Sequence, residues 1–153
     1  MMTDDVRTPA EREQLARRVA EAMRASDTAA QGAGVELVDV GPGHAVTALT
    51  VEQRHVNGHR ICHGGYLFLL ADAAFAYACN SFGTPTVAAG GDIVFLRPGH
   101  LGDRLLAEAT LRSESGRSGV YDVTVRSGDT VIAEFRGRSR AVPSMSHPPG
   151  VTD

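Results

Sequence analysis

A single acidic residue, Asp72, interrupts an apolar run that extends from Tyr66 to Cys79. A helix that is apolar on every side must be covered by the rest of the protein, and an ionised carboxylate inside it is costly unless it is paired, hydrogen-bonded or protonated. Acids perturbed in this way cluster at functional sites. Asp72 is therefore a candidate general base or nucleophile for attack on a carbonyl carbon. The alternative is a structural carboxylate that accepts hydrogen bonds from backbone amides.

Two glycines, Gly64 and Gly65, precede the apolar run and follow His63. Paired glycines weaken a helix interior, so the first helical turn is expected near Tyr66. A glycine-led helix start leaves backbone N–H groups free at the positive end of the helix dipole, which suits an anion or a developing oxyanion. Alone the pair would indicate only a turn. Beside Asp72 it indicates an oxyanion donor.

The spacing of these groups has a consequence for assembly. Gly65 and Asp72 are seven residues apart, which corresponds to about 10 Å along a helix axis. One small reacting group cannot touch both. If both act on the same carbonyl, two copies of the helix must run antiparallel, with Asp72 of one chain facing the glycines of the other. This geometry predicts an obligate dimer with its sites at the interface.

A metal site is the other chemistry that this region suggests. Four potential ligands lie within nine residues, namely His55, His59, Cys62 and His63. The turn around Gly58 disrupts any regular face, and no acidic residue completes a set of ligands. The sequence therefore predicts no metal and no organic cofactor, with His63 orienting the helix start or a substrate group. Cys62 lacks a paired base, which disfavours a thiol nucleophile.

The elements that must hold these residues can be read from the periodicity. Thr8, Pro9 and Glu11 form a capped helix start, and the helix is expected to end near Ala25 with one apolar face made of Leu15, Val19 and Met23. Residues 26–34 are expected to be a loop. Strands are expected at Val35–Val40, Ala45–Glu52, Thr86–Leu96 and, with a clear period of two, at 105–112, 121–126 and 131–138.

This order has no β-α-β alternation, so it predicts an α+β fold in which the long helix lies on a curved antiparallel sheet whose strands have one apolar and one polar face. We expect an N-terminal segment with an amphipathic helix over residues 1–26, in which 1–7 are frayed. The main domain is expected at 27–142 and a disordered tail at 143–153.

The composition of the chain excludes some classes of binding partner. The chain has 153 residues, 42% of them hydrophobic, and a net charge of −3. It therefore lacks the basic field that nucleic-acid binding needs, and no apolar run approaches the roughly 20 residues of a membrane span. The first residues include Asp4 and Asp5 and lack a signal-peptide core, so a cytoplasmic location is expected. Cys62 and Cys79 are then expected to be reduced.

Several of these motifs together resemble one family. They are Asn57, His63-Gly64-Gly65, Leu70 to Ala76 around Asp72, Asn80-Ser81, Phe95-Leu96-Arg97-Pro98-Gly99 and Gly119 to Val123. In this combination the chain resembles the PaaI group of hotdog-fold acyl-CoA thioesterases, the phenylacetate-pathway type, from about residue 35 to residue 142. The combined motifs are specific, although a His-Gly-Gly alone would not be.

The resemblance implies a hotdog fold, a dimer with one continuous sheet, and often a homotetramer built from two such dimers. It implies hydrolysis of aromatic acyl-CoA thioesters of the phenylacetyl or hydroxyphenylacetyl type. Asp72 then matches the catalytic carboxylate, Gly64 and Gly65 match the helix start whose amide polarises the thioester carbonyl, and Asn57 and His63 match supporting polar residues.

Substrate contacts follow from the same resemblance. Aromatic residues of the long helix could line the acyl pocket, and we expect Phe68 and Phe75 to do so. Arg97, Arg117 and Ser118 are candidates for the nucleotide end of coenzyme A, because the guanidinium fork suits phosphate. Relatives often carry a hydroxyl on the strand after the helix to hold the attacking water, whereas this chain has Val87-Ala88-Ala89-Gly90-Gly91 there.

Two other functions remain open from the residues alone. The fold could catalyse hydration or dehydration of an acyl thioester, which would require a His paired with the carboxylate on the long helix, and the helix offers Asp72 without a His. The chain could also be a non-catalytic acyl-CoA-binding module, in which case replacement of Asp72 by Asn would leave its function intact.

Overall fold

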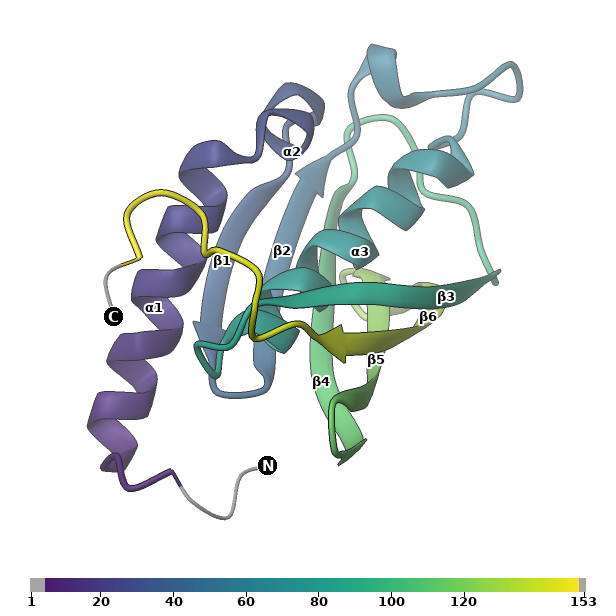
Figure 1. Cartoon of the computed structure of the whole chain (residues 1–153). Coiled ribbons are helices and arrows are strands. Elements are labelled where there is room, and N and C mark those ends of the chain that lie inside the picture. Colours follow the sequence, from purple (N-terminus) through teal and green to yellow (C-terminus); the bar gives the residue numbers. More distant parts are fainter. Residues whose placement is uncertain (1–4, 152–153) are drawn as a thin grey trace.

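The computed structural model describes residues 5–151, which form one antiparallel sheet wrapped around a long helix (Figure 1). The sheet has six strands in the order β1-β2-β4-β5-β6-β3. Their bounds are β1 Glu36–Gly41, β2 His44–Thr50, β3 Thr86–Phe95, β4 Arg104–Ser115, β5 Ser118–Ser127 and β6 Thr130–Ala141. The helices are α1 Pro9–Ser26, α2 Thr28–Ala33 and α3 Gly64–Asn80, with a 3₁₀ turn at Gln53–His55. The predicted α+β fold is confirmed.

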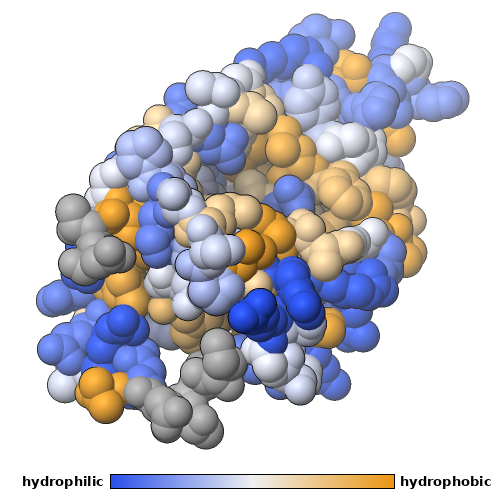
Figure 2. Space-filling model, in the orientation of Figure 1, coloured by the Kyte–Doolittle hydropathy of each residue, from blue (hydrophilic) through white to orange (hydrophobic). Residues whose placement is uncertain are grey.

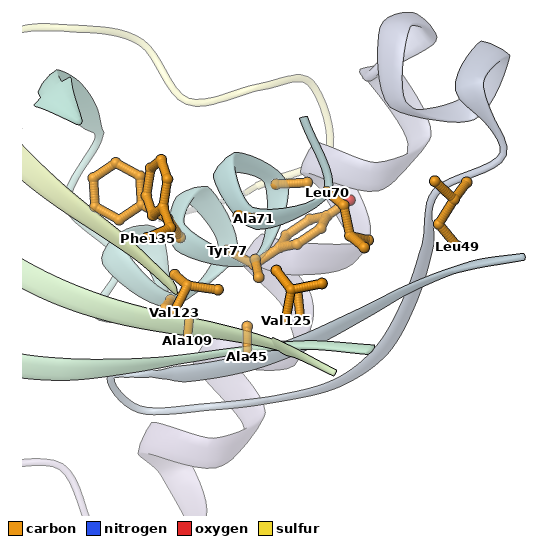
Figure 3. Close-up of a cluster of buried hydrophobic side chains, with 14 of the residues drawn as sticks. Ala45, Leu49, Leu70, Ala71, Tyr77, Ala109, Val123, Val125 and Phe135 are labelled. Atoms are coloured by element: carbon orange, nitrogen blue, oxygen red, sulfur yellow. The ribbon is translucent and has the colours of Figure 1, made fainter. Parts of the chain in front are cut away.

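The core lies between α3 and the sheet. Alternate residues of β4 and β5 face the helix and are fully buried, among them Leu105, Ala107, Ala109, Val123 and Val125. Leu70, Ala71 and Tyr77 of α3 belong to the same buried apolar cluster as this layer, as Figure 3 shows. Burial of a Leu or Phe side chain is worth about 2 kcal/mol, so α3 is held to the sheet mainly by such contacts.

The N-terminal helix has the predicted capping box. The Glu11 N–H donates to Thr8 Oγ1 at 3.2 Å, and the Thr8 N–H donates to Glu11 Oε2 at 2.6 Å. The buried face differs slightly from the expected one, because Ala16, Val19, Ala20 and Ala22 are buried whereas Leu15 and Met23 are only partly covered. Small side chains let α1 approach its neighbours closely, which the spacing of large apolar residues alone does not reveal.

The expectation of a loop over residues 26–34 is wrong, because Thr28–Ala33 is a short helix, α2. Its two ends are capped. The Asp27 Oδ1 atom accepts a hydrogen bond from the Ala30 N–H at 2.9 Å, and Gly34 ends the helix in the left-handed conformation with φ of 84°. Six residues are too few to show a helical period, so the caps were its only signal in the sequence.

The long helix also begins two residues earlier than expected, at Gly64 rather than near Tyr66. His63 caps it, since the Gly65 N–H donates to His63 Nδ1 at 2.9 Å. Glycine costs little in a first turn whose N–H groups have no intrahelical partner. The prediction failed because it applied the penalty for a helix interior to a helix start.

A single chain does not cover α3 completely. Gly65 and Phe68 are exposed, and Asp72 and Ala76 are partly exposed, so one stripe of the helix faces outward. No residue of β3 is fully buried in a single chain. The reason is that β3 is an edge strand with only one neighbour, β6. Figure 2 shows apolar residues across the middle of the face that carries α3 and β3.

The described part of the C-terminal tail lies beside the first helix. The described part of the tail contains no helix or strand, and Gly150 approaches Ala22 of α1, as the yellow trace in Figure 1 shows. Residues 1–4 and 152–153, which belong to the segments expected to be frayed or disordered, lie outside the described residues. Among residues 5–151, no helix is both long and apolar enough to span a membrane.

Candidate active site

Asp72 faces a hollow between α3 and the edge strand β3. The hollow measures about 260 Å³ and is lined by Phe68, Asp72, Phe135 and residues 88–91 of β3. Within residues 5–151 no hydrogen bond reaches the Asp72 carboxyl, and its pKa is raised, first by burial and second by the negative charge of Asp27. A structural carboxylate would be held by backbone amides. The Asp72 carboxyl has no such partner, so it remains available to a substrate.

The walls of the hollow are aromatic rings, and its floor is made of residues with small side chains. The Phe68 ring, 38% exposed, packs edge-on against Phe135 with centroids 5.2 Å apart. A Cβ atom on Gly91 would lie 3.0 Å from the Phe135 ring, so glycine is needed for this close approach. Ala88 and Ala89 are the largest side chains that β3 contributes. The space therefore suits a flat apolar group beside a carboxylate.

The start of α3 provides one free backbone donor rather than two. The Gly65 N–H is used by the His63 ring, which also means that a neutral His63 carries its proton on Nε2. The N–H of Gly64, the first helical residue, points out of the helix and has no intrahelical acceptor. The Phe95 ring lies where a side chain of residue 64 would be, with its Cζ atom 2.8 Å from that Cβ position. Of the predicted pair, Gly64 is the available donor.

Asn57 shapes the loop that leads into α3. Its Oδ1 atom accepts hydrogen bonds from the His59 N–H at 2.9 Å and the Ile61 N–H at 3.4 Å, and its carbonyl accepts one from the Arg60 N–H at 2.9 Å. Arg60 has a positive φ of 61°, which the turn requires. In this chain Asn57 thus acts on the backbone before His63, as a supporting polar residue would.

The four residues that suggested a metal site have other partners or surroundings. His55 is fully buried, its Nδ1 atom accepts from the Glu52 N–H at 2.9 Å, and its Nε2 atom lies 2.7 Å from the Ala33 carbonyl oxygen. Cys62 is buried, and burial raises the pKa of its thiol to about 11. Over the described range 5–151, no group of three or more His, Cys, Asp or Glu residues is arranged to hold a metal ion.

The remaining predicted contacts do not line the hollow of Asp72. Phe75 is 1% exposed and lies in the core between Tyr121 and Phe135. Arg97 follows Phe95 by two residues, and its Nη1 atom donates to the Val131 carbonyl at 3.0 Å. Arg117 and Ser118 line a different cavity, which shares no residue with this one. One chain therefore brings together Asp72 and Phe68, with Gly64 and His63 farther along the same helix.

Three residues near the site have effects that the sequence-based predictions did not include. Phe95 belongs to a quoted motif, but nothing in the sequence says that its ring rests on Gly64. Phe135 is one aromatic residue in an alternating strand, and only the sheet order places it beside Phe68. Asp27 marks the cap of α2, which was expected to be a loop, so its effect on the pKa of Asp72 was hidden as well.

The Gly64 N–H and the Asp72 carboxyl are far apart within one chain. Gly64 and Asp72 lie eight residues apart on α3, which is about 12 Å along the axis. No single thioester carbonyl can contact both the Gly64 N–H and the carboxylate of the same chain.

Comparisons with known proteins identify the family of this chain. Residues 59–134 match the model of the thioesterase superfamily. Acyl-coenzyme A thioesterase PaaI of Escherichia coli is 45% identical over 124 residues, which cover 80% of this chain and 89% of that protein. The structure of E. coli PaaI, from the phenylacetic acid degradation operon, superposes with a TM-score of 0.83 at 43% identity and covers 85% of this chain and 95% of that one.

A Streptococcus mutans protein solved with bound acetyl-CoA has a TM-score of 0.67 at 27% identity, and the match covers 71% of this chain and 88% of that one. Residues 59–134, which match the superfamily model, contain α3 with Asp72, the helix start and the strand β3 that lines the hollow. The chain therefore belongs to the thioesterase superfamily, as a hotdog-fold acyl-CoA thioesterase of the PaaI type.

Proposed function

We propose that this acyl-CoA thioesterase acts on aromatic acyl groups, at sites that two protomers build together. The observation that carries the proposal is the hollow of Asp72, where a carboxylate without a hydrogen-bond partner lies beside the Phe68 and Phe135 rings over a floor of Gly and Ala. An aromatic ring gains from edge-to-face contacts with such walls in addition to its apolar burial. The PaaI relative, named for phenylacetic acid degradation, is consistent with this class of acyl group.

The partner is inferred from the surfaces that one chain leaves uncovered. β3 is a ten-residue edge strand, and it carries Val87, Val94 and Phe95, all more than a third exposed. A long, flat, apolar edge is a template for pairing with another strand. Pairing β3 with its copy would continue the sheet and bring the outward stripes of the two α3 helices together. A homodimer is therefore the smallest active unit, and two dimers can pair into a homotetramer.

In such a dimer the distance between the two groups is bridged by symmetry. The thioester carbonyl oxygen accepts a hydrogen bond from the Gly64 N–H of one protomer, where the helix dipole stabilises the developing negative charge. The carboxylate of the other protomer's Asp72 either removes a proton from an attacking water or attacks the carbonyl carbon itself. In both routes the C–S bond breaks and coenzyme A leaves as the thiolate.

The strand beside Asp72 bears on how the water is held. Residues 88–91 are two alanines and two glycines, so β3 offers backbone groups and no hydroxyl to the attacking water. A direct attack by Asp72 would form a mixed anhydride that water hydrolyses afterwards. Single-turnover hydrolysis in ¹⁸O-water distinguishes the routes, because only the anhydride route can place the label in the Asp72 carboxyl group.

The acyl preference is tested by release of free thiol from aryl-acetyl, benzoyl and straight-chain acyl-CoA thioesters. Wild type should prefer aryl-acetyl thioesters in kcat/KM, and Asp72→Asn should lose turnover while the dimer persists. Phe68→Ala should reduce the aryl preference, whereas Leu106→Ala, a change of similar exposure on β4, should not. Equal turnover of straight-chain and aryl-acetyl thioesters by wild type would refute the aromatic assignment and leave the thioesterase activity in place.

A further inference from the structure

A second cavity, larger than the hollow of Asp72, lies at the C-terminal end of α3. It has a volume of about 450 Å³ and is formed where the chain before α1, the β4–β5 turn and the start of β3 meet, in the lower part of Figure 1. Its lining shares no residue with the hollow of Asp72. The volume falls in the range typical of small-molecule sites.

The inner wall of this cavity carries the hydroxyl groups of two largely buried residues. Tyr121 is 3% exposed and Ser139 is 6% exposed, and both line the cavity. Neither hydroxyl oxygen is among the fully buried, unpartnered polar atoms of residues 5–151, so both open onto the cavity. A polar ligand atom in the cavity could bind either hydroxyl, as polar groups at this depth usually have a partner.

The space in front of the hydroxyls depends on a glycine. Gly119 pairs with Ser139 across the sheet, and a Cβ atom at residue 119 would lie 2.6 Å from Ser139 Oγ and 3.1 Å from the Tyr121 ring. Any larger residue would fill the inner end of the cavity. The rest of the wall includes apolar groups, namely Cys79, Phe82 and Ala141.

The rim of the cavity carries a small excess of positive charge. Three guanidinium groups, of Arg7, Arg12 and Arg117, face two carboxylates, of Asp5 and Glu114. Arg12 donates from Nη2 to the Asp5 carbonyl at 2.9 Å, and its buried Nε atom, which has no hydrogen-bond partner among the described residues, forms an ion pair with Asp5 Oδ2 at 3.6 Å. A singly charged anion at the rim would neutralise this excess and could accept from Arg12 or Arg117.

We propose that this cavity is a second ligand site, which binds a small monocarboxylic acid with an apolar body. The carboxylate lies at the arginines of the rim, the body lies against Cys79, Phe82 and Ala141, and a polar substituent can reach the Tyr121 and Ser139 hydroxyls. The free acids released by thioester hydrolysis belong to this class. Arg117 and Ser118 thus serve this ligand rather than the nucleotide end of coenzyme A.

The experiment measures binding of phenylacetate, 4-hydroxyphenylacetate and hexanoate to the full chain by calorimetry and by NMR. Ser139→Ala and Tyr121→Phe should each raise the Kd of 4-hydroxyphenylacetate about fivefold, as loss of one buried hydrogen bond does. Gly119→Ala should abolish binding. Thr124→Val, which removes a hydroxyl from β5 outside the cavity lining, is the matched control and should leave the Kd unchanged.

Independence from the catalytic hollow is measured in the same assay. Asp72→Asn should bind the acids as wild type does, and saturating coenzyme A should not displace them. Displacement by coenzyme A, or a Kd that changes in Asp72→Asn and not in Ser139→Ala, would assign the acid to the catalytic site and overturn the proposal. Absence of binding to wild type at millimolar acid would overturn it too. Neither result depends on whether the aromatic acyl preference is correct.

Discussion

Asp72 combines two properties that seldom coexist in a structural acid. Its side chain is partly buried on an apolar helix, and within residues 5–151 it has no hydrogen-bond partner. Burial and the charge of Asp27 both raise its pKa. A carboxylate of raised pKa is a stronger base, which suits proton removal from water near neutral pH, and its ionisation costs the folded protein stability.

The first prediction concerns that cost. Because the pKa of Asp72 is higher in the folded than in the unfolded chain, the folded state binds more protons, and the stability contribution present at low pH is lost as the pH rises through the raised value. Asp72→Asn should therefore have a higher Tm than wild type at neutral pH and the same Tm below about pH 4, where the acid is protonated in both states. A wild type more stable than the Asn variant at pH 7 would mean that the carboxylate is paired.

The second prediction isolates the charge of Asp27. Its carboxylate raises the pKa of Asp72 and also caps α2, and Asn caps helices as well as Asp does. In Asp27→Asn the acidic limb of the pH profile of kcat should thus move to lower pH, with the Tm nearly unchanged. Asp39→Asn is the control, because the Asp39 carboxylate is not among the charges that raise the pKa of Asp72. If the acidic limb of the kcat profile does not move in Asp27→Asn, the ionising group that controls kcat is not Asp72.

At the scale of elements, the start of α3 and the strand β3 make the site. α3 presents Gly64, His63 and Asp72 along one rod, and β3 supplies the floor of the hollow together with the Phe95 ring that rests on Gly64. The helix start can be probed without breaking the helix. Proline is favoured at the first helical position, and His63 has the extended backbone, with ψ of 135°, that a following proline requires.

The third prediction uses this tolerance. Gly64→Pro removes the N–H proposed to stabilise the oxyanion, and Gly64→Ala keeps it, while both place a Cβ atom against the Phe95 ring. The Pro variant should have a kcat about 100-fold lower than the Ala variant, with a similar Tm, because loss of one oxyanion donor has roughly that effect. Stopped thiol-release assays measure the ratio. Equal kcat values in the two variants would remove the Gly64 amide from the mechanism.

Sequence and structure agree where the signal is local. The strands β4, β5 and β6 show their period of two, Thr8 and Glu11 form the expected capping box, and Asp72 lies on a helix that is otherwise apolar, as its neighbours in the sequence predict. α2 was missed because its six residues show no period. The exposure of β3 could not be read from its residues, because the coverage of an edge strand depends on a neighbour that the strand itself does not encode. Phe135 and Phe95 reach the site only through sheet order, which residue spacing does not give.

At the scale of the whole molecule, a single chain leaves apolar surface uncovered on α3 and β3. The central helix α3 has an outward stripe with Phe68 and Asp72, and beside it the sheet ends in the apolar edge of β3. The other edge of the sheet, β1, carries an exposed valine as well, so the two edges can be compared directly.

The fourth prediction compares them. Val94 on β3 is 56% exposed and Val38 on β1 is 50% exposed. A lysine at an edge opposes strand pairing, so Val94→Lys should give an inactive monomer, whereas Val38→Lys should remain an active dimer. Sedimentation and thiol release on the same samples decide the matter. A dimer that survives Val94→Lys and dissociates in Val38→Lys would place the interface on the opposite edge.

The central claim is that each site takes Gly64 from one protomer and Asp72 from the other. The most direct measurement is thiol release after subunit exchange between Gly64→Pro and Asp72→Asn, each inactive alone. Random exchange makes half of the dimers mixed, and a mixed dimer has one intact and one doubly altered site, so activity should recover to about a quarter of wild type. Mixed dimers that form, as mass spectrometry would show, yet gain no activity would contradict the shared site.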